Sequence, residues 1–156
     1  MTKTKHCLLI VDDEPDVCDS VHDLLRREFR VLKANSAQEG CRIMQEEEVH
    51  MVMSDQRMPQ ITGVELLTRV KTRYPHAVRM LYTGYADLDS IIAAINQGHI
   101  YQFIKKPWQP EELLDAVRQA ASEYDRLARA DAEREQLIHE ISELKARVTL
   151  LEAEKK

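Results

Sequence analysis

Short apolar runs recur along the chain, and polar or turn-forming residues follow each of them. Four of these runs are apolar enough to form strands of a buried parallel sheet: Cys7–Val11, Met51–Ser54, Arg79–Tyr82 and Tyr101–Ile104. The segment Phe29–Ala34 has the pattern of a further strand. Because helical hydrophobic spacing separates each run from the next, we predict an α/β fold with a doubly wound, five-stranded parallel sheet and right-handed crossovers.

Capping residues and prolines mark where the intervening helices begin. Two capping-box pairs, Ser36 with Glu39 and Thr62 with Glu65, open the second and third helices. The first helix is expected to begin near Pro15 and to run to about Glu28, and the fourth to span roughly Leu88–Gln97.

The last segment of the chain has a different pattern. From Pro110 to Lys156 there is no Gly and no further Pro, which predicts a C-terminal helix too long to pack only on its own sheet. A heptad register can be written through this segment, with mostly apolar residues at positions a and d. The a positions are Leu127, Arg134, Ile141 and Val148, and the d positions are Ala130, Leu137, Leu144 and Leu151.

The charges beside this apolar seam favour a parallel pair of helices. In such a pair, position g of one helix faces the next e of its partner. Three of these pairs have opposite charges: Arg126 with Asp131, Glu140 with Lys145, and Arg147 with Glu152. We therefore predict that residues 124–156 form a coiled-coil extension and that the protein is a parallel homodimer. The competing interpretation is a solvated charged helix without a partner.

Composition excludes several classes of protein. The chain has 156 residues, 44% hydrophobic, which is enough for one domain of about residues 1–123 and an appendage. Its net charge of -5, without a Lys/Arg cluster, argues against direct nucleic-acid binding. No apolar run is long enough for a signal peptide or a membrane span, so we expect a cytoplasmic protein with no membrane partner. Cys7, Cys18 and Cys41 lack metal-ligand spacing and are expected to be buried thiols.

Polar side chains follow the apolar runs where the strands should end. Asp12 and Asp13 follow the first run, Asp55 follows the run at Met51, and Thr83 and Lys106 follow the last two. Since the carboxyl ends of parallel strands meet at one edge, we expect these groups to converge in one crevice. Three carboxylates at one place favour a hard divalent cation.

Four motifs at these strand ends match a known family. They are Val11-Asp12-Asp13-Glu14-Pro15, Ser54-Asp55-Gln56-Arg57-Met58-Pro59, Tyr82-Thr83-Gly84 and Phe103-Ile104-Lys105-Lys106-Pro107-Trp108. From about residue 5 to 123 the chain thus resembles the receiver domain of bacterial two-component response regulators. In detail it is similar to the receivers of hydrogenase-type transcriptional regulators and of HD-GYP phosphodiesterases. The resemblance implies a flavodoxin-like sheet of order 2-1-3-4-5 and a signalling domain, not a metabolic enzyme.

The resemblance also implies a phosphoacceptor and a metal site. Asp55 would take a phosphoryl group from the phosphohistidine of a sensor histidine kinase. Asp12, Asp13, Asp55 and the backbone carbonyl of Arg57 would hold Mg²⁺. Transfer of a phosphoryl group to an anionic carboxylate requires concentrated positive charge, which Mg²⁺ and a lysine supply.

Three further roles follow from the same resemblance. Lys106 and Thr83 would bind the phosphoryl group, and the bond before Pro107 would be cis. Thr83 would move inward on activation, and Phe103 would follow it as the second switch residue. Without the family resemblance, core packing accounts for Phe103 equally well.

Arg57 and Tyr85 are predicted to set the lifetime of the signal. They lie two residues beyond Asp55 and Thr83, positions that in the family flank the approach of a hydrolytic water. A guanidinium and a phenol can cover a phosphoryl group but cannot orient a water as a carboxylate does, so slow self-dephosphorylation is expected. The alternative is that both side chains point into solvent.

Two other functions compete with that of a receiver. A haloacid-dehalogenase-type phosphatase needs a second Asp two residues after its nucleophile, and neither Asp12 nor Asp55 has one. A degenerate receiver would serve only as a dimerisation scaffold, yet all the acceptor-site residues are present. The output is open: either an output domain follows Lys156, or the coiled coil itself binds an effector.

Overall fold

The computed structural model of the chain describes residues 4–84 and 88–155. The chain divides into two compact units, residues 1–124 and 125–156. Within the described ranges, no helix combines the length and the apolar content that a membrane crossing requires.

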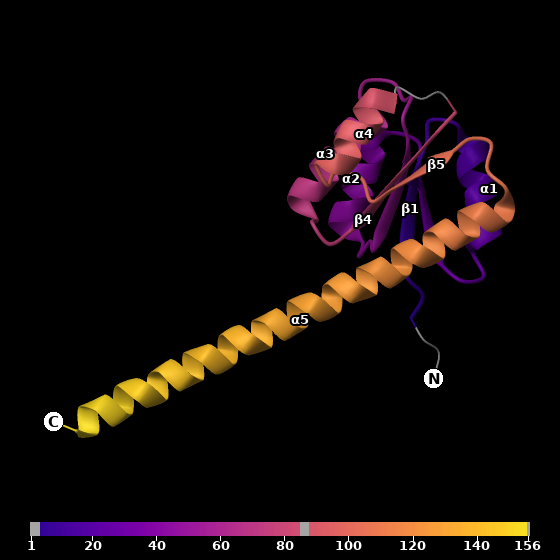
Figure 1. Ribbon diagram of the computed structural model, residues 1–156. Coiled ribbons are helices and arrows are strands. Elements are labelled where there is room, and N and C mark those ends of the chain that lie inside the picture. Colours follow the sequence, from indigo (N-terminus) through magenta and orange to yellow (C-terminus); the bar gives the residue numbers. More distant parts are fainter. Residues whose placement is uncertain (1–3, 85–87, 156) are drawn as a thin grey trace. The chain divides into compact units, whose positions relative to one another are not determined.

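A parallel sheet of five strands forms the centre of the first unit (Figure 1). Its strands are β1 (Cys7–Val11), β2 (Arg30–Ala34), β3 (Met51–Asp55), β4 (Val78–Thr83) and β5 (Gln102–Lys105). They lie in the order β2-β1-β3-β4-β5. This arrangement confirms the predicted doubly wound, flavodoxin-like fold.

Helices follow the strands in alternation, as expected. They are α1 (Pro15–Leu25), α2 (Ala37–Glu46), α3 (Gly63–Arg73), α4 (Leu88–Asn96) and α5 (Pro110–Glu154). The capping residues act as predicted: the Ser36 hydroxyl accepts the Glu39 N–H at 3.0 Å, and the Thr62 hydroxyl accepts the Glu65 N–H at 3.2 Å.

Helix α1 is shorter than the sequence pattern predicts. It ends at Leu25 and not near Glu28. The N–H of Phe29 donates to the Leu25 carbonyl at 2.9 Å, and the Phe29 side chain is buried in the core. Burial of this aromatic turns the chain inward, so the charged residues before it cannot continue the helix.

The two faces of the sheet are covered by different helices (Figure 1). Leu8 and Ile10 of β1 point to one face, where α1 and residues 113–121 of α5 pack against them. Leu9 and Val11 point to the other face, beneath α2, α3 and α4. Because β1 has apolar neighbours on both faces, all five of its residues are buried, which explains its uninterrupted apolar sequence.

The three cysteines are not equally buried. Cys7 and Cys18 are enclosed, as predicted, and burial raises the pKa of the Cys18 thiol to about 11. Cys41 was expected to be buried too, but it is only partly so. It lines a cavity of about 400 Å³ between α2 and α3, with Met44, Val70 and Tyr74 among the other lining residues. Cys41 therefore packs against the core on one side and lines a surface groove on the other.

Gly63 allows α3 to begin directly against β3. A Cβ at this position would lie 2.3 Å from the carbonyl oxygen of Asp55 and 2.6 Å from Cδ1 of Leu81. The first of these atoms is backbone and cannot move aside. We therefore predict that Gly63→Ala lowers the free energy of unfolding by about 3 kcal/mol or more, measured by urea denaturation.

Gly84→Ala is the matched control for this substitution. Among the described residues, a Cβ at Gly84 would meet only Cβ of Lys106, at an ordinary 3.5 Å. Its effect should be below about 1 kcal/mol. Equal losses in the two variants would show that the close approach at Gly63 is unimportant.

The second unit is helical to Glu154 and carries a row of exposed apolar side chains. The side chains at five of the predicted seam positions are each more than half exposed: Leu137, Ile141, Leu144, Val148 and Leu151. Ile138 and Leu150, outside the seam, are exposed as well. A coiled coil through this unit stays a prediction.

Candidate functional site

The strand register brings the predicted polar residues to one edge of the sheet. Val11 of β1 pairs with Ser54 of β3, so Asp12 and Asp55 follow neighbouring positions. Asp55 in turn pairs with Tyr82 of β4. Thr83 pairs with Lys105 of β5, which places Lys106 one residue beyond the ladder. The carboxyl edge thus collects residues from β1, β3, β4 and β5.

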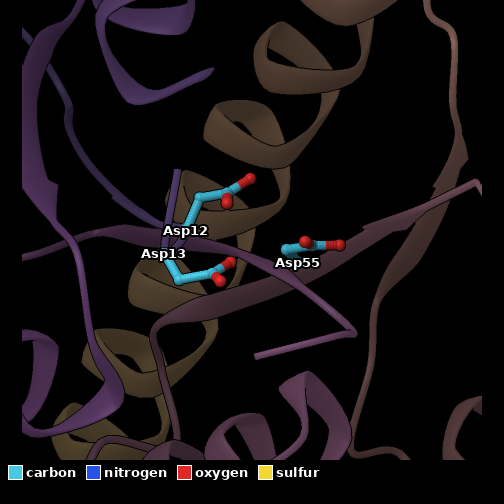
Figure 2. Close-up of side chains that lie close together, drawn as sticks. All are labelled: Asp12, Asp13 and Asp55. Atoms are coloured by element: carbon cyan, nitrogen blue, oxygen red, sulfur yellow. The ribbon is translucent and has the colours of Figure 1, made fainter. Parts of the chain in front are cut away.

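Three carboxylates meet at this edge (Figure 2). Asp12, Asp13 and Asp55 each offer an oxygen, and these oxygens all lie within 4.8 Å of one another. Asp12 is 1% exposed and Asp55 9% exposed, whereas Asp13 is open to solvent. Magnesium prefers oxygen ligands, takes few carboxylates and keeps several waters. The donor set and its one open side fit that cation.

Lys106 places a positive charge beside the carboxylates. Its Nζ lies 3.5 Å from Oδ1 of Asp55 and 3.8 Å from Oδ2 of Asp12. The backbone N–H of Lys106 donates to the carbonyl of Thr83 at 3.0 Å, which ties the loop after β5 to the end of β4. The bond between Lys106 and Pro107 is cis, as the resemblance implies.

Opposing effects act on the protonation of Asp55. Burial raises the pKa of its carboxyl, the Lys106 ammonium acts to lower it, and the charge of Asp12 raises it further; the net shift is upward. Lys106 thus favours the anionic form of this carboxylate, against the effects of burial and of Asp12. An anionic oxygen is the form that can act as a nucleophile.

The loop after Asp55 is held against the start of α3. The side-chain carbonyl of Gln56 accepts the N–H of Val64 at 3.0 Å, and its backbone carbonyl accepts the N–H of Gly63 at 3.0 Å. The hydroxyl of Ser54 donates to the carbonyl of Asp55 at 2.9 Å. These hydrogen bonds fix the backbone on both sides of Asp55.

The other predicted site residues lie in different surroundings. Thr83 is buried at the end of β4, and Phe103 of β5 is half-buried against the core beneath α3 and α4. Arg57 is exposed. Tyr85 lies outside the described residues.

Tyr82 belongs to the site, although the sequence analysis assigned it only to a strand. Its hydroxyl donates to Oδ2 of Asp12, and its ring lies 4.5 Å from Nζ of Lys106. Burial, together with the bond to Asp12, raises the pKa of this phenol, so it remains a donor. One sequence signal could have indicated it: a tyrosine inside an apolar run predicted to be buried on both faces needs a partner for its hydroxyl.

Comparison with known proteins identifies the first unit. The family model described as "Response regulator receiver domain" matches residues 8–118. Apart from Cys7, that stretch covers all five strands and the residues of the carboxyl edge. It covers more than half of the chain.

Individual relatives agree with this match. The chain is 44% identical over 120 residues to the hydrogenase transcriptional regulatory protein HoxA of Cupriavidus necator, which covers 77% of this chain and 25% of that protein. HoxA of Bradyrhizobium diazoefficiens is 40% identical over 117 residues, or 75% of this chain and 24% of that protein. The chain thus spans about a quarter of the length of these relatives.

A solved structure shows the same fold. The signal receiver domain of an HD domain-containing protein from Pseudomonas fluorescens Pf-5 has a TM-score of 0.75 and 34% sequence identity. The alignment covers 79% of this chain and 99% of that one. The hydrogenase-type regulators that the loop sequences indicated are therefore among its relatives, and the receiver of an HD domain-containing protein is similar to it in structure.

Proposed function

This chain belongs to the response regulator receiver domain family, and from that premise we propose that Asp55 accepts a phosphoryl group from a sensor histidine kinase. Receiver domains of this family are signalling domains, not metabolic enzymes, and sensor histidine kinases phosphorylate them. One observation carries the assignment to Asp55: its carboxylate lies at the end of the central strand β3, within the acidic cluster and 3.5 Å from the Lys106 ammonium.

Besides the phosphohistidine donor, the transfer needs one nucleophile and no further reactant. An oxygen of the Asp55 carboxylate attacks phosphorus, a new O–P bond forms, and the P–N bond to the donor histidine breaks. The electron pair of that bond returns to the imidazole. Lys106 offsets the negative charge that the phosphoryl oxygens bring to an already anionic site, and Thr83 would donate its hydroxyl to one of those oxygens.

Receiver domains bind Mg²⁺ at their acidic pocket, and in this chain Asp12, Asp13, Asp55 and the backbone carbonyl of Arg57 would hold it. When bound, the ion supplies positive charge that offsets the charge on the phosphoryl oxygens. Asp12 and Asp13 differ in exposure and would have different tasks. Buried Asp12 offers a fixed carboxylate, whereas exposed Asp13 leaves room for the waters that Mg²⁺ retains.

Mass spectrometry tests the proposal. Incubation with a small acyl phosphate and Mg²⁺ should add one phosphoryl group, and peptide mapping should place it on Asp55. Removal of Mg²⁺ by a chelator should prevent the reaction. A phosphoryl group mapped to a histidine, or uptake that is indifferent to the chelator, would contradict the proposed roles.

The proposed switch residues lie on β4 and β5. Thr83 and Phe103 are proposed as the switch, with Thr83 moving toward the phosphoryl group and Phe103 following. Their positions support this: Leu81 of β4 pairs with Phe103 of β5, two residues before Thr83, so the two side chains belong to adjacent strands. A change at the site would thus reach β5 over a short distance.

Residues 1–123 are proposed as the receiver and residues 124–156 as a coiled coil that makes the protein a parallel homodimer. The division of the chain after Tyr124 and the exposed apolar row of the second unit support this. The relatives of greater length include transcriptional regulatory proteins. We accordingly propose that the coiled coil passes the signal to an output domain or effector in the cytoplasm, with no direct contact of this chain with nucleic acid or membrane.

Slow loss of the phosphoryl group is the expected result for the wild-type protein. The exposed Arg57 and its counterpart Tyr85 offer no carboxylate to orient a water. A variant with Arg57→Asn and Tyr85→Glu should therefore lose the group roughly 10-fold faster or more. The decay is followed by mass spectrometry after removal of the phosphodonor. Equal decay of the two proteins would assign the lifetime to a partner phosphatase instead.

A further inference from the structure

Tyr82 contacts two groups of opposite charge in the site. Its hydroxyl donates a hydrogen bond to Oδ2 of Asp12, and the ammonium of Lys106 lies over its ring, 4.5 Å from the centroid. We propose that Tyr82 is a positioning residue for phosphoryl transfer: its hydroxyl fixes the Asp12 carboxylate toward Mg²⁺, and its ring fixes Lys106 toward the phosphoryl group. This inference rests on the proposed function of the site.

The hydroxyl completes the fixation of Asp12 at both oxygens. Oδ1 of this carboxylate accepts the backbone N–H of Glu14 at 2.9 Å, and Oδ2 accepts the Tyr82 hydroxyl. The carboxylate therefore cannot rotate without losing a hydrogen bond. Each carboxylate oxygen has two acceptor positions, so both can still face a cation or a water bound to it. Hydrogen bonds that orient a ligating carboxylate typically contribute roughly 10- to 100-fold in metal affinity.

The aromatic ring of Tyr82 contacts the positive charge of the site, the ammonium of Lys106. Nζ of Lys106 is 3.5 Å from Asp55 and 3.8 Å from Asp12, which are ion-pair distances too long for good hydrogen bonds. An aromatic face attracts an ammonium most strongly where water is excluded, and Tyr82 is fully buried. Trp108 meets the same ring edge-on, with centroids 5.3 Å apart. The Tyr82 ring thus contacts two side chains of the loop after β5, those of Lys106 and Trp108.

Packing alone does not account for a tyrosine here. A leucine or phenylalanine would also fill a buried position of β4 and would bring no hydroxyl that needs a partner. The hydroxyl of Tyr82 finds that partner in a carboxylate of the metal cluster. Phenylalanine keeps the ring and loses only the hydroxyl, so the two contributions can be measured separately.

Tyr82→Phe tests the hydroxyl. Isothermal titration calorimetry of Mg²⁺ should show a dissociation constant roughly 10-fold higher or more than in the wild type. At saturating Mg²⁺ the rate of phosphorylation by a small acyl phosphate should return to the wild-type rate. Tyr74→Phe, in the segment after α3, is the matched control and should change neither quantity. An unchanged Mg²⁺ affinity in Tyr82→Phe overturns this inference, whereas a wild-type protein that binds no Mg²⁺ overturns the proposed function.

Tyr82→Leu tests the ring. This variant should be phosphorylated roughly 10-fold more slowly than Tyr82→Phe even at saturating Mg²⁺, because Lys106 loses the aromatic face. Equal plateau rates in the two variants would show that the ring has no part in positioning the lysine. Thermal unfolding of each variant separates these effects from a loss of folded protein.

The wild-type protein provides a test that does not depend on any variant. The protein is prepared with isotopically labelled tyrosine. The hydroxyl proton of a buried phenol that is hydrogen-bonded to a carboxylate exchanges slowly with water, so it can be observed by NMR. Its resonance should shift when Mg²⁺ is added, because the Asp12 carboxylate then acquires the cation. A Tyr82 hydroxyl resonance that does not respond to Mg²⁺ contradicts the link between this residue and the metal site.

Discussion

Asp55→Asn should reduce the amount of phosphoryl group bound after a fixed time by roughly 100-fold or more. The amide is close to the carboxylate in size but has no anionic oxygen to attack phosphorus. Incubation with a small acyl phosphate and Mg²⁺, followed by intact-mass measurement, gives the result directly. Uptake by the variant at the wild-type level would show that another residue is the acceptor.

Misfolding should not contribute to that loss, because the charge of Asp55 does not stabilise the fold. Asp55 is a buried carboxylate whose pKa burial raises, so its charge costs folding energy that the Lys106 ammonium only partly offsets. A neutral amide removes that cost, and the free energy of unfolding should fall by no more than about 1 kcal/mol. Asp23→Asn, at an exposed carboxylate of α1, is the matched control and should take up phosphate as the wild type does.

The second large effect is expected in the oligomeric state. Leu137→Gln together with Leu144→Gln should convert dimers into monomers, measured by sedimentation equilibrium. Each leucine contributes roughly 2 kcal/mol when buried, so four leucines per dimer amount to about 8 kcal/mol. That loss corresponds to more than about five powers of ten in the dissociation constant.

Leu150 provides the control for this experiment. Its side chain is at least as exposed as those of the two seam leucines, but it lies at position c of the heptad, outside the seam. Leu150→Gln should leave the dimer intact. If the double variant remains dimeric as well, the receiver surfaces hold the pair together and the coiled coil does not.

The sheet could be predicted from sequence because its central strands are buried on both faces. Residues 7–11 are uniformly apolar and are followed directly by two aspartates, a pattern typical of an inner strand of a parallel sheet. Strand order and the converging strand ends then followed from chain topology and from the resemblance of four motifs to a family. For this reason the convergence of Asp12, Asp13, Asp55 and Lys106 was predictable from the sequence.

Contacts that depend on a side chain's direction were not predictable in the same way. Tyr82 has the pattern of one more bulky residue of β4, and only the register opposite Asp55 shows that its hydroxyl reaches the aspartate after β1. Cys41 occupies an apolar position of α2 and packs against the core, yet it also lines a groove at the surface. The side chain of Gln56 accepts a hydrogen bond from Val64, eight residues later, which no local pattern indicates.

The buried part of α5 has a consequence for how such domains are joined to others. Its enclosed residues, from Leu113 to Ala121, belong to the core of the first unit, and the ring of Tyr124 lies 4.6 Å from that of His50. No residue from Asp125 to Lys155 is buried. A gene fusion made between residues 124 and 125 would therefore leave every core side chain in place while exchanging the whole tail. Recombination at this junction could attach the same receiver to unrelated partners, provided that the new segment continues the helix.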